Sequence, residues 1–230
     1  MLRAPFLSWI PLALLIMACC RPSAVLISSF PSKIDRMEGY ASLRISGEQG
    51  VTRARFSFLF HLPDQGRIEV SDFLGRTLYQ VIINGDKAFF VLPSKEAYWQ
   101  GEEEEIINKF LGFTMALHEM TSLLSGQWKR PMDYNKGNKN SEAWLLERDE
   151  KGRILAGQRG SLRFERKEFI ENSPIARILV FEHAKIIGRV KVLSIEFNRA
   201  LKNNVFSTLF VRNYKQKTWA EFQALMNNES

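Results

Sequence analysis

The chain has 230 residues, of which 45% are hydrophobic and 25% are charged. This balance, with no low-complexity tract, excludes a disordered protein and allows one domain with a sizeable core. The net charge of +7 is scattered among acidic residues, which is typical of a solvated surface; weak attraction to anionic lipid is the functional alternative. Nucleic-acid binding is not expected of an exported protein.

The N-terminus has the layout of an export signal. Arg3 precedes an uncharged, largely apolar run over residues 4–18, and Cys19 and Cys20 follow it. A positive start, an apolar stretch and a small residue before the cut are the features that the export machinery reads. We therefore expect residues 1–18 to be a signal peptide. A transmembrane anchor is the weaker alternative, because the run is shorter than the roughly 20 residues that cross a bilayer.

The end of this run, Ile16-Met17-Ala18-Cys19, resembles the bacterial lipobox, whose cysteine is diacylated before cleavage. It predicts a covalent lipid on Cys19, and acyl chains that each contribute ~0.8 kcal/mol per buried methylene would hold the protein at a membrane. The alternative is an ordinary signal peptide that ends near two cysteines. No cysteine follows Cys20, so no disulfide framework is expected.

The rest of the chain divides into a tether and one domain. Residues 19–35 lack a clear period and are expected to be a lipidated tether whose apolar part can dock on the domain, which spans residues 36–230. Alternation with period two predicts strands over 38–46 and 51–62. The second strand places Phe56, Phe58 and Phe60 on one face, and on the other Arg53, Arg55, Ser57 and His61.

Short turns link the strands that follow. Strands are predicted over 67–72 and 76–83, on either side of Phe73-Leu74-Gly75. Asn84-Gly85 is expected to supply the positive φ angles of a tight hairpin into a strand over 87–92. Sequential strands joined in this way predict an antiparallel meander.

Two short amphipathic helices are expected to interrupt the meander, over 102–111 and 116–125, and to end at Gly112 and Gly126. The first begins with four glutamates, 102–105. We expect them to stabilise the helix by complementing its dipole, in preference to a metal-binding or catalytic role. Thr218 and Glu221 predict a capping box for a terminal helix. Between the second central helix and the terminal helix, strands are predicted over 142–148, 153–156, 161–169, 176–183 and 189–199.

The sequence offers little catalytic chemistry. The three histidines lie far apart without metal-ligand spacing, and there is no glycine-rich phosphate loop and no G-x-S-x-G elbow. We therefore expect no enzyme, no metal and no cofactor besides the covalent lipid. A catalytic site assembled from distant residues is a remote alternative.

Residues 66–131 resemble the lipoprotein-localisation family of LolB, the outer-membrane lipoprotein receptor, and LolA, the periplasmic carrier. The order and spacing of short pieces carry the resemblance. Later strands match loosely, and the loop over 133–140 has no counterpart in the family. The matching pieces are Arg67-Ile68-Glu69-Val70 before Phe73-Leu74-Gly75, the hairpin at Asn84-Gly85, the acidic helix start, Phe110-Leu111-Gly112-Phe113, Leu117, and Leu123-Leu124-Ser125-Gly126.

This resemblance implies a mainly β (α+β) fold: an incomplete, strongly curved antiparallel β-barrel with short helices covering the open side. It also implies an apolar cavity that accepts the acyl chains of a lipoprotein as a transient ligand. The alternative for each lining residue is a filled core, because buried apolar side chains look alike in a sequence in both cases. The residues expected to line the cavity or its lid are Phe56, Phe58, Phe60, Ile107, Leu111, Leu117 and Leu124.

The resemblance also implies roles for two exposed sites. Phe73-Leu74-Gly75 aligns with the family's Pro-Leu-Gly loop, whose leucine inserts into the membrane, although Phe73 replaces the proline. The alternative is that Phe73 and Leu74 pack back into the barrel. Arg67 matches a basic residue at the start of the same strand, and is interpreted as either a surface charge or a hydrogen-bonding partner of the helical lid.

The expected protein is a monomer anchored by Cys19 at the periplasmic face of the outer membrane, since Cys20 is not the aspartate that retains enteric lipoproteins at the inner membrane. By analogy, it would receive lipoproteins from a LolA-like carrier and help insert them into the membrane lipid. The alternative is a structural or sensory envelope lipoprotein that uses the same scaffold to bind a protein partner.

Overall fold

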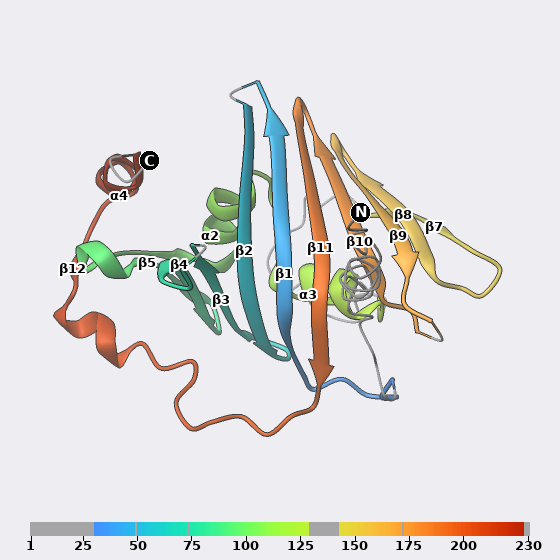
Figure 1. The fold of residues 1–230 in the computed structure, drawn as a ribbon, viewed down its shortest axis with the longest axis horizontal. Coiled ribbons are helices and arrows are strands. Elements are labelled where there is room, and N and C mark those ends of the chain that lie inside the picture. The colour runs from blue at the N-terminus through green and yellow to red at the C-terminus, as the bar shows by residue number, and fades with distance from the viewer. Residues whose placement is uncertain (1–29, 49, 73, 129–142, 172, 228–230) are drawn as a thin grey trace, which may run out of the picture.

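One large β-sheet organises the protein (Figure 1). The computed structural model describes residues 30–48, 50–72, 74–128, 143–171 and 173–227, except the Phe110 side chain. Within these ranges twelve strands form a single sheet that does not close on itself. The predicted incomplete barrel of mainly β class, with short helices, is therefore confirmed.

Two meanders meet in the middle of this sheet. The first strand, β1, pairs with β2 on one side and with β11 on the other, so the second meander runs back toward the first. β12 adds to the edge strand β6 in parallel. The strands are β1 (Arg36–Gly47), β2 (Gly50–His61), β3 (Gln65–Ser71), β4 (Thr77–Asn84), β5 (Lys87–Leu92), β6 (Ala97–Glu102), β7 (Leu145–Arg148), β8 (Ile154–Arg159), β9 (Leu162–Phe169), β10 (Ala176–His183), β11 (Ile186–Phe197) and β12 (Lys215–Gln216).

Three α-helices and two 3-10 turns accompany the sheet in the described part of the chain. Gly112 and Gly126 end the two central helices with positive φ angles of 82° and 73°, as predicted. The helical elements are η2 (Pro93–Lys95), α2 (Glu103–Leu111), α3 (Leu117–Ser125), η3 (Leu209–Asn213) and α4 (Trp219–Asn227).

The observed elements differ from the expected ones in three places. The chain has a strand, β6, where no strand was predicted, and the two-residue strand β12 carried no signal in the sequence. In the β4–β5 hairpin, Asn84 pairs with Lys87, so the turn is Gly85-Asp86 and of these two only Gly85 has a positive φ. The expected turn was therefore misplaced by one residue.

The inner face of the sheet carries the core. Strand alternation places Phe58, Ile68, Val81, Phe90 and Trp99 opposite one another across five neighbouring strands. All five are buried in one hydrophobic cluster that also takes in apolar side chains of α2, α3 and α4. Because these helices contribute to the same cluster, they cover the inner face.

Glycines face phenylalanines across this inner surface. A Cβ on Gly39 would lie 2.7 Å from the Phe58 ring and 2.2 Å from a Ser194 carbonyl oxygen, so only glycine leaves room for the ring. Rings that lie over a neighbouring backbone allow the sheet to bend without crowding its inner face. Three such cross-strand pairs are Gly39 with Phe58, Gly66 with Phe60 and Gly157 with Phe164.

The C-terminal segment leaves β11 and reaches the far edge of the sheet (Figure 1). There it forms β12 and then α4, whose Trp219 and Phe222 rings pack 4.9 Å from Trp99 and 5.1 Å from Phe90. The predicted capping box is confirmed, because the Thr218 amide donates to Glu221 Oε2 at 2.9 Å and the Glu221 amide donates to Thr218 Oγ1. This segment therefore extends the sheet at its β6 edge and covers the inner face there.

The residues before β1 lie against the C-terminal end of β11, where the chain leaves that strand. The Phe30 ring contacts Phe197 at 5.6 Å, and the Asn198 side chain accepts hydrogen bonds from the backbone amides of Asp35 and Arg36. Residues 30–35 are thus packed on the domain. Among the helices of the described ranges, none is long and apolar enough to cross a bilayer.

Candidate functional site

The predicted lining residues come together on the inner face. Phe58, Phe60, Ile107, Leu117 and Leu124 are at most 5% exposed and belong to the central cluster. The remaining two, Phe56 and Leu111, are partly buried against the same cluster. Both a lipid-accepting lining and a filled core require this arrangement.

Helix α3 is placed over the strands by its first residue. A Cβ built on Gly66 would lie 3.1 Å from the Phe60 ring and 3.3 Å from Leu117 Cδ1, so Leu117 sits over the junction of β2 and β3. A larger residue at position 66 would require the Phe60 ring or the Leu117 side chain to shift by a few tenths of an ångström. The aromatic row of β2 therefore lies directly beneath α3.

A buried carboxylate fastens α3 to the second meander. Glu119 is 8% exposed and accepts hydrogen bonds from both terminal guanidinium nitrogens of Arg159 on β8, at 2.6 and 3.1 Å. It also accepts the indole N–H of Trp144 at 2.6 Å and the amide of Ala116 at 3.1 Å. The Arg159 guanidinium stacks 4.5 Å from the Trp144 ring. We call this group, Glu119 with Arg159 and Trp144, the latch.

A second carboxylate joins the two covering helices. Glu103, in the first turn of α2, accepts a hydrogen bond from the Leu117 backbone amide at the start of α3. Burial raises the pKa of the Glu103 carboxyl above its ordinary value, and the neighbouring Glu104 adds to that rise, while the Leu117 amide opposes it. The glutamates were expected to have a structural role at the start of their own helix. Glu103 does have a structural contact, but with the first residue of the next helix, α3.

Replacing Glu103 with glutamine should remove a loss of folding stability that the wild-type protein suffers as the pH rises. Because the folded pKa is raised, the contribution of Glu103 to stability is present at low pH and is lost as the pH rises through the folded pKa. The amide keeps a carbonyl acceptor for Leu117 and carries no charge. The reference pKa of glutamate is 4.5. In urea titrations above about this pH, the free energy of unfolding of Glu103→Gln should increase relative to that of the wild type as the pH rises. A constant difference between the two would contradict this account.

The loop after β3 presents Leu74 to solvent. Leu74 is 64% exposed, and its amide donates to Asp72 Oδ1 at 2.8 Å. Asp72 also binds the Arg76 amide and guanidinium, at 2.9 and 2.7 Å, and Gly75 takes a positive φ of 81°. Desolvation raises the pKa of Asp72, but the hydrogen bonds from Arg76 and Leu74 prevail and hold it below its ordinary value. Asp72 therefore holds the backbone at Leu74 and Arg76, with the leucine side chain outward.

Arg67 lies on the outer face of the sheet, away from the two central helices. Its guanidinium binds Glu69 at 2.5 and 2.8 Å and the Val205 carbonyl at 2.8 Å. Its bound partners are thus a neighbour on its own strand and the C-terminal segment, which neither interpretation of the sequence named.

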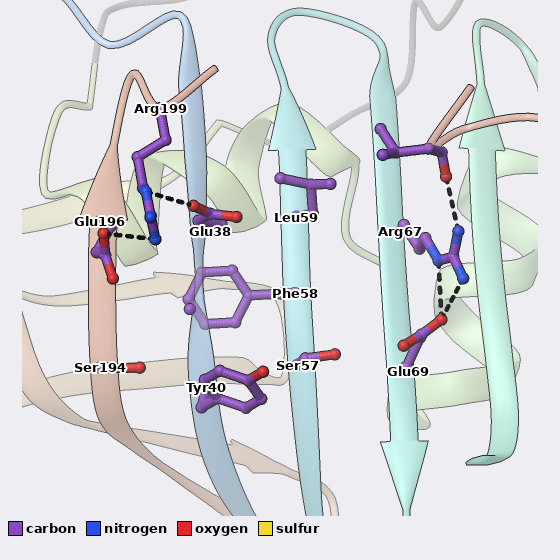
Figure 2. A pocket seen from close by; sticks show the side chains of 12 residues that line it. Glu38, Tyr40, Ser57, Phe58, Leu59, Arg67, Glu69, Ser194, Glu196 and Arg199 are labelled. Atoms are coloured by element: carbon purple, nitrogen blue, oxygen red, sulfur yellow. Dashed lines mark hydrogen bonds and ion pairs between the residues drawn. The ribbon is translucent and has the colours of Figure 1, made fainter. Parts of the chain in front are cut away.

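This arginine borders a pocket of about 300 Å³ between the outer face and the C-terminal segment (Figure 2). Arg199 closes the other side through ion pairs with Glu38 at 3.5 Å and Glu196 at 3.0 Å. Phe58 forms part of its floor, beside Gly39. The pocket is polar and opens on the face opposite the predicted lining.

A buried arginine was not predicted. Arg166 on β9 is 3% exposed and donates to the carbonyls of Ile154 and Pro174, and its Nε has no hydrogen-bond partner among the described residues. Burial lowers its pKa to about 10, and the nearby Arg153 adds to that effect. The available signal was its place in the strand alternation, two residues after the buried Phe164.

The latch had no signal in the sequence, since Arg159 and Glu119 are 40 residues apart. Cys19 and Phe73 lie outside the described residues, as does the loop over 133–140. In the parts of the chain that are described, no group of three or more acidic, histidine or cysteine side chains is placed to hold a metal ion.

Solved structures share this fold at low sequence identity. A domain from Vibrio parahaemolyticus ascribed to outer membrane lipoprotein sorting is 11% identical, with a TM-score of 0.57 over 80% of this chain and 94% of its own. A DUF1329 family protein from Desulfovibrio piger is also 11% identical, with a TM-score of 0.57 over 77% of this chain and 91% of its own.

A LolA superfamily protein from Nitrosomonas europaea superposes more loosely, with 12% identity and a TM-score of 0.49 over 78% of this chain and 93% of its own. No protein-family model and no curated protein matches the sequence. At this level of identity the likeness establishes the fold alone. The chain thus shares its open-sheet fold with the Vibrio parahaemolyticus and Desulfovibrio piger proteins.

Proposed function

We propose that this protein is a lipid-anchored envelope lipoprotein that accepts the acyl chains of other lipoproteins on the inner face of its half-barrel. In this proposal it then helps to insert them into the outer membrane. The observation that carries the proposal is a continuous aromatic and aliphatic surface covered by two short helices. Such a surface can exchange helix contacts for acyl-chain contacts of similar apolar character.

The covering helices are suited to move as a lid. Each has nine residues and ends at a glycine, and the polar contacts that hold them are few: Glu103 joins α2 to the start of α3, and the latch joins α3 to the second meander. Helices of this length draw their stability from tertiary packing. The partly buried Phe56 and Leu111 mark where an acyl chain would first reach the inner face.

Delivery would use the anchor on Cys19 and the exposed Leu74 together. Leu74 lies at the end of the sheet where β1 turns into β2, whereas Phe30 lies at the opposite end. The eleven-residue stretch from Cys19 to Phe30 can span at most about 36–40 Å, roughly the length of a 12-residue strand. The tether is therefore long enough for the anchor and Leu74 to meet one membrane, with a LolA-like carrier as the proposed donor.

A second candidate function is a structural or sensory role. The polar pocket in Figure 2, with three carboxylates and two arginines, favours a polar ligand or protein segment on the outer face. Such an occupant would leave the inner face as a filled core. In this second function the protein is still anchored through Cys19 but binds no acyl chain.

Mass spectrometry of the full protein, purified from membranes without harsh detergent, separates the two functions. We expect a lipoprotein or acyl lipid to co-purify at close to one molecule per protein and to be lost when Phe56 is replaced by aspartate, which puts a charge at the entrance. Glu69→Gln in the outer pocket serves as the matched control and should retain the ligand. A folded protein without a bound acyl species would leave the structural or sensory role as the better account.

A further inference from the structure

Five cationic side chains gather on the outer face of the three longest strands. The register sets Arg53, Arg44 and Arg189 side by side across β2, β1 and β11. Two residues further along the same strands, Arg55 and Lys191 flank Ser42. Rows on one face of a strand lie about 6.8 Å apart. We call these five residues the arginine rows.

The sheet itself gives no reason for this arrangement. All five side chains are exposed, and none has an ion pair or side-chain hydrogen bond in the described part of the protein. Like charges placed directly opposite each other on neighbouring strands destabilise a sheet. The arginine rows therefore cost stability in the isolated protein, as a surface kept for a partner does.

Carboxylates on this face do not neutralise the rows. Glu48 binds Lys185 at 2.5 Å at the hairpin tips, and Glu165 binds Arg163 and Lys167 at 3.0 and 2.5 Å. Glu38 and Glu196 are held by Arg199. Glu69, one row from Arg55 on β3, is bound by Arg67 at 2.5 Å, and Glu182 stands opposite Ile187, one row nearer the tip than Arg189. Within the described residues, no carboxylate therefore forms an ion pair with the arginine rows.

Apolar side chains lie just beyond the arginines. Val51 and Ile187 both face Ser46 and are 53% and 51% exposed. The two hairpins that carry them, β1–β2 and β10–β11, project past the neighbouring strands (Figure 1). Leu74 is exposed at the same end of the sheet. Inward of the Glu48–Lys185 ion pair at the tips, the surface thus changes from aliphatic to strongly basic.

We infer that this surface binds the face of an anionic phospholipid bilayer. The order of residues matches the depth profile of a membrane, with aliphatic side chains at the acyl boundary and arginines at the level of the phosphates. Arginine binds phosphate through two parallel hydrogen bonds, which suits lipid headgroups. An acidic protein would satisfy the arginines but gives no reason for the exposed valine and isoleucine at the tips. The inference holds whether or not the inner face carries acyl cargo.

Photoactivatable lipids test this surface with the full lipidated protein in vesicles. The probe is a phosphatidylglycerol with a photoreactive headgroup, and a phosphatidylcholine with the same group is the neutral comparison. We expect cross-links to concentrate on residues 42–55 and 187–191 with the anionic lipid. Arg44→Gln, Arg53→Gln and Arg189→Gln together should reduce them about tenfold or more. The matched control, Lys151→Gln, Lys202→Gln and Arg212→Gln, removes the same charge from other exposed positions and should leave them unchanged.

Three outcomes would overturn the inference. Equal cross-linking by the neutral lipid would make the contact independent of charge, and cross-links outside these strands would place the membrane elsewhere. Insensitivity to the triple arginine variant would remove the arginines from the contact. The triple variant should unfold at the same temperature as the wild type or higher, because it relieves like-charge pairs. A lower unfolding temperature would instead assign the arginine rows a structural role.

Discussion

Arg159→Ala should destabilise the protein by about 3 kcal/mol and release α3 from the second meander. The substitution removes two hydrogen bonds to Glu119, one to the Thr114 carbonyl and the stacking on Trp144. It leaves a carboxylate that is only 8% exposed without its counter-charge. Hydrogen exchange should therefore accelerate across α3 before the sheet unfolds, and equilibrium urea titration should show the loss.

Arg163→Ala is the matched control. Arg163 is on the adjacent strand β9 and pairs with Glu165 at 3.0 Å, but its side chain is 50% exposed. An exposed pair contributes about 0–1 kcal/mol, so this variant should behave almost like the wild type. Equal effects of the two substitutions, or unchanged exchange in α3 for Arg159→Ala, would show that the latch does not hold the helix.

Leu74→Glu should impair release of cargo into liposomes about tenfold or more while leaving the fold and cargo acceptance intact. The side chain is 64% exposed and its loop is fixed by Asp72, so the folded protein loses little contact. Insertion of one leucine contributes only ~1.5–3 kcal/mol, which orients the protein without anchoring it. A carboxylate resists entry into the acyl region. Transfer of a labelled lipoprotein from carrier to liposome measures the effect.

Leu209→Glu makes the same chemical change at a leucine that is 59% exposed in the C-terminal segment. It should transfer cargo normally. If both variants slow transfer equally, the effect comes from added charge and not from the loop. A loss of ~2–5 kcal/mol in stability for Leu74→Glu would instead mean that Leu74 is buried in solution.

Most of the sheet could be predicted because its strands follow a local rule. Alternation placed the strands over 51–62 and 176–183 almost residue for residue, and glycines marked both helix ends. These features depend on neighbours within a few residues. They are therefore visible in one sequence.

The pairing of β1 with β11 could not be predicted, because it joins residues about 150 positions apart and has no local signal. The same holds for β12, whose two residues pair with β6 from across the domain. β6 was different. The alternation of Ala97 and Trp99 is a local signal for β6, but the strand is short and runs without a turn into the acidic start of α2.

The polar parts of the site were the least predictable. Alternation placed the arginines of β2 on the face opposite Phe56, Phe58 and Phe60. No local sequence pattern predicted that Arg44 and Arg189 would align with Arg53. Arg67 was singled out because it matches a basic residue at the start of the same strand in the LolB and LolA family, and its partners are residues 69 and 205. Ion pairs depend on register between distant strands, which periodicity within one strand does not fix.

The central claim is that acyl chains enter the inner face of the half-barrel. A cargo lipoprotein with a photoreactive acyl chain, incubated with the full protein in vesicles, tests it when the cross-linked residues are mapped. We expect attachment near Phe56 and Leu111 and on α3, and none at Tyr40, which is 62% exposed on the outer face of the same sheet. Attachment to the outer face alone, or none in a folded protein, would contradict the account.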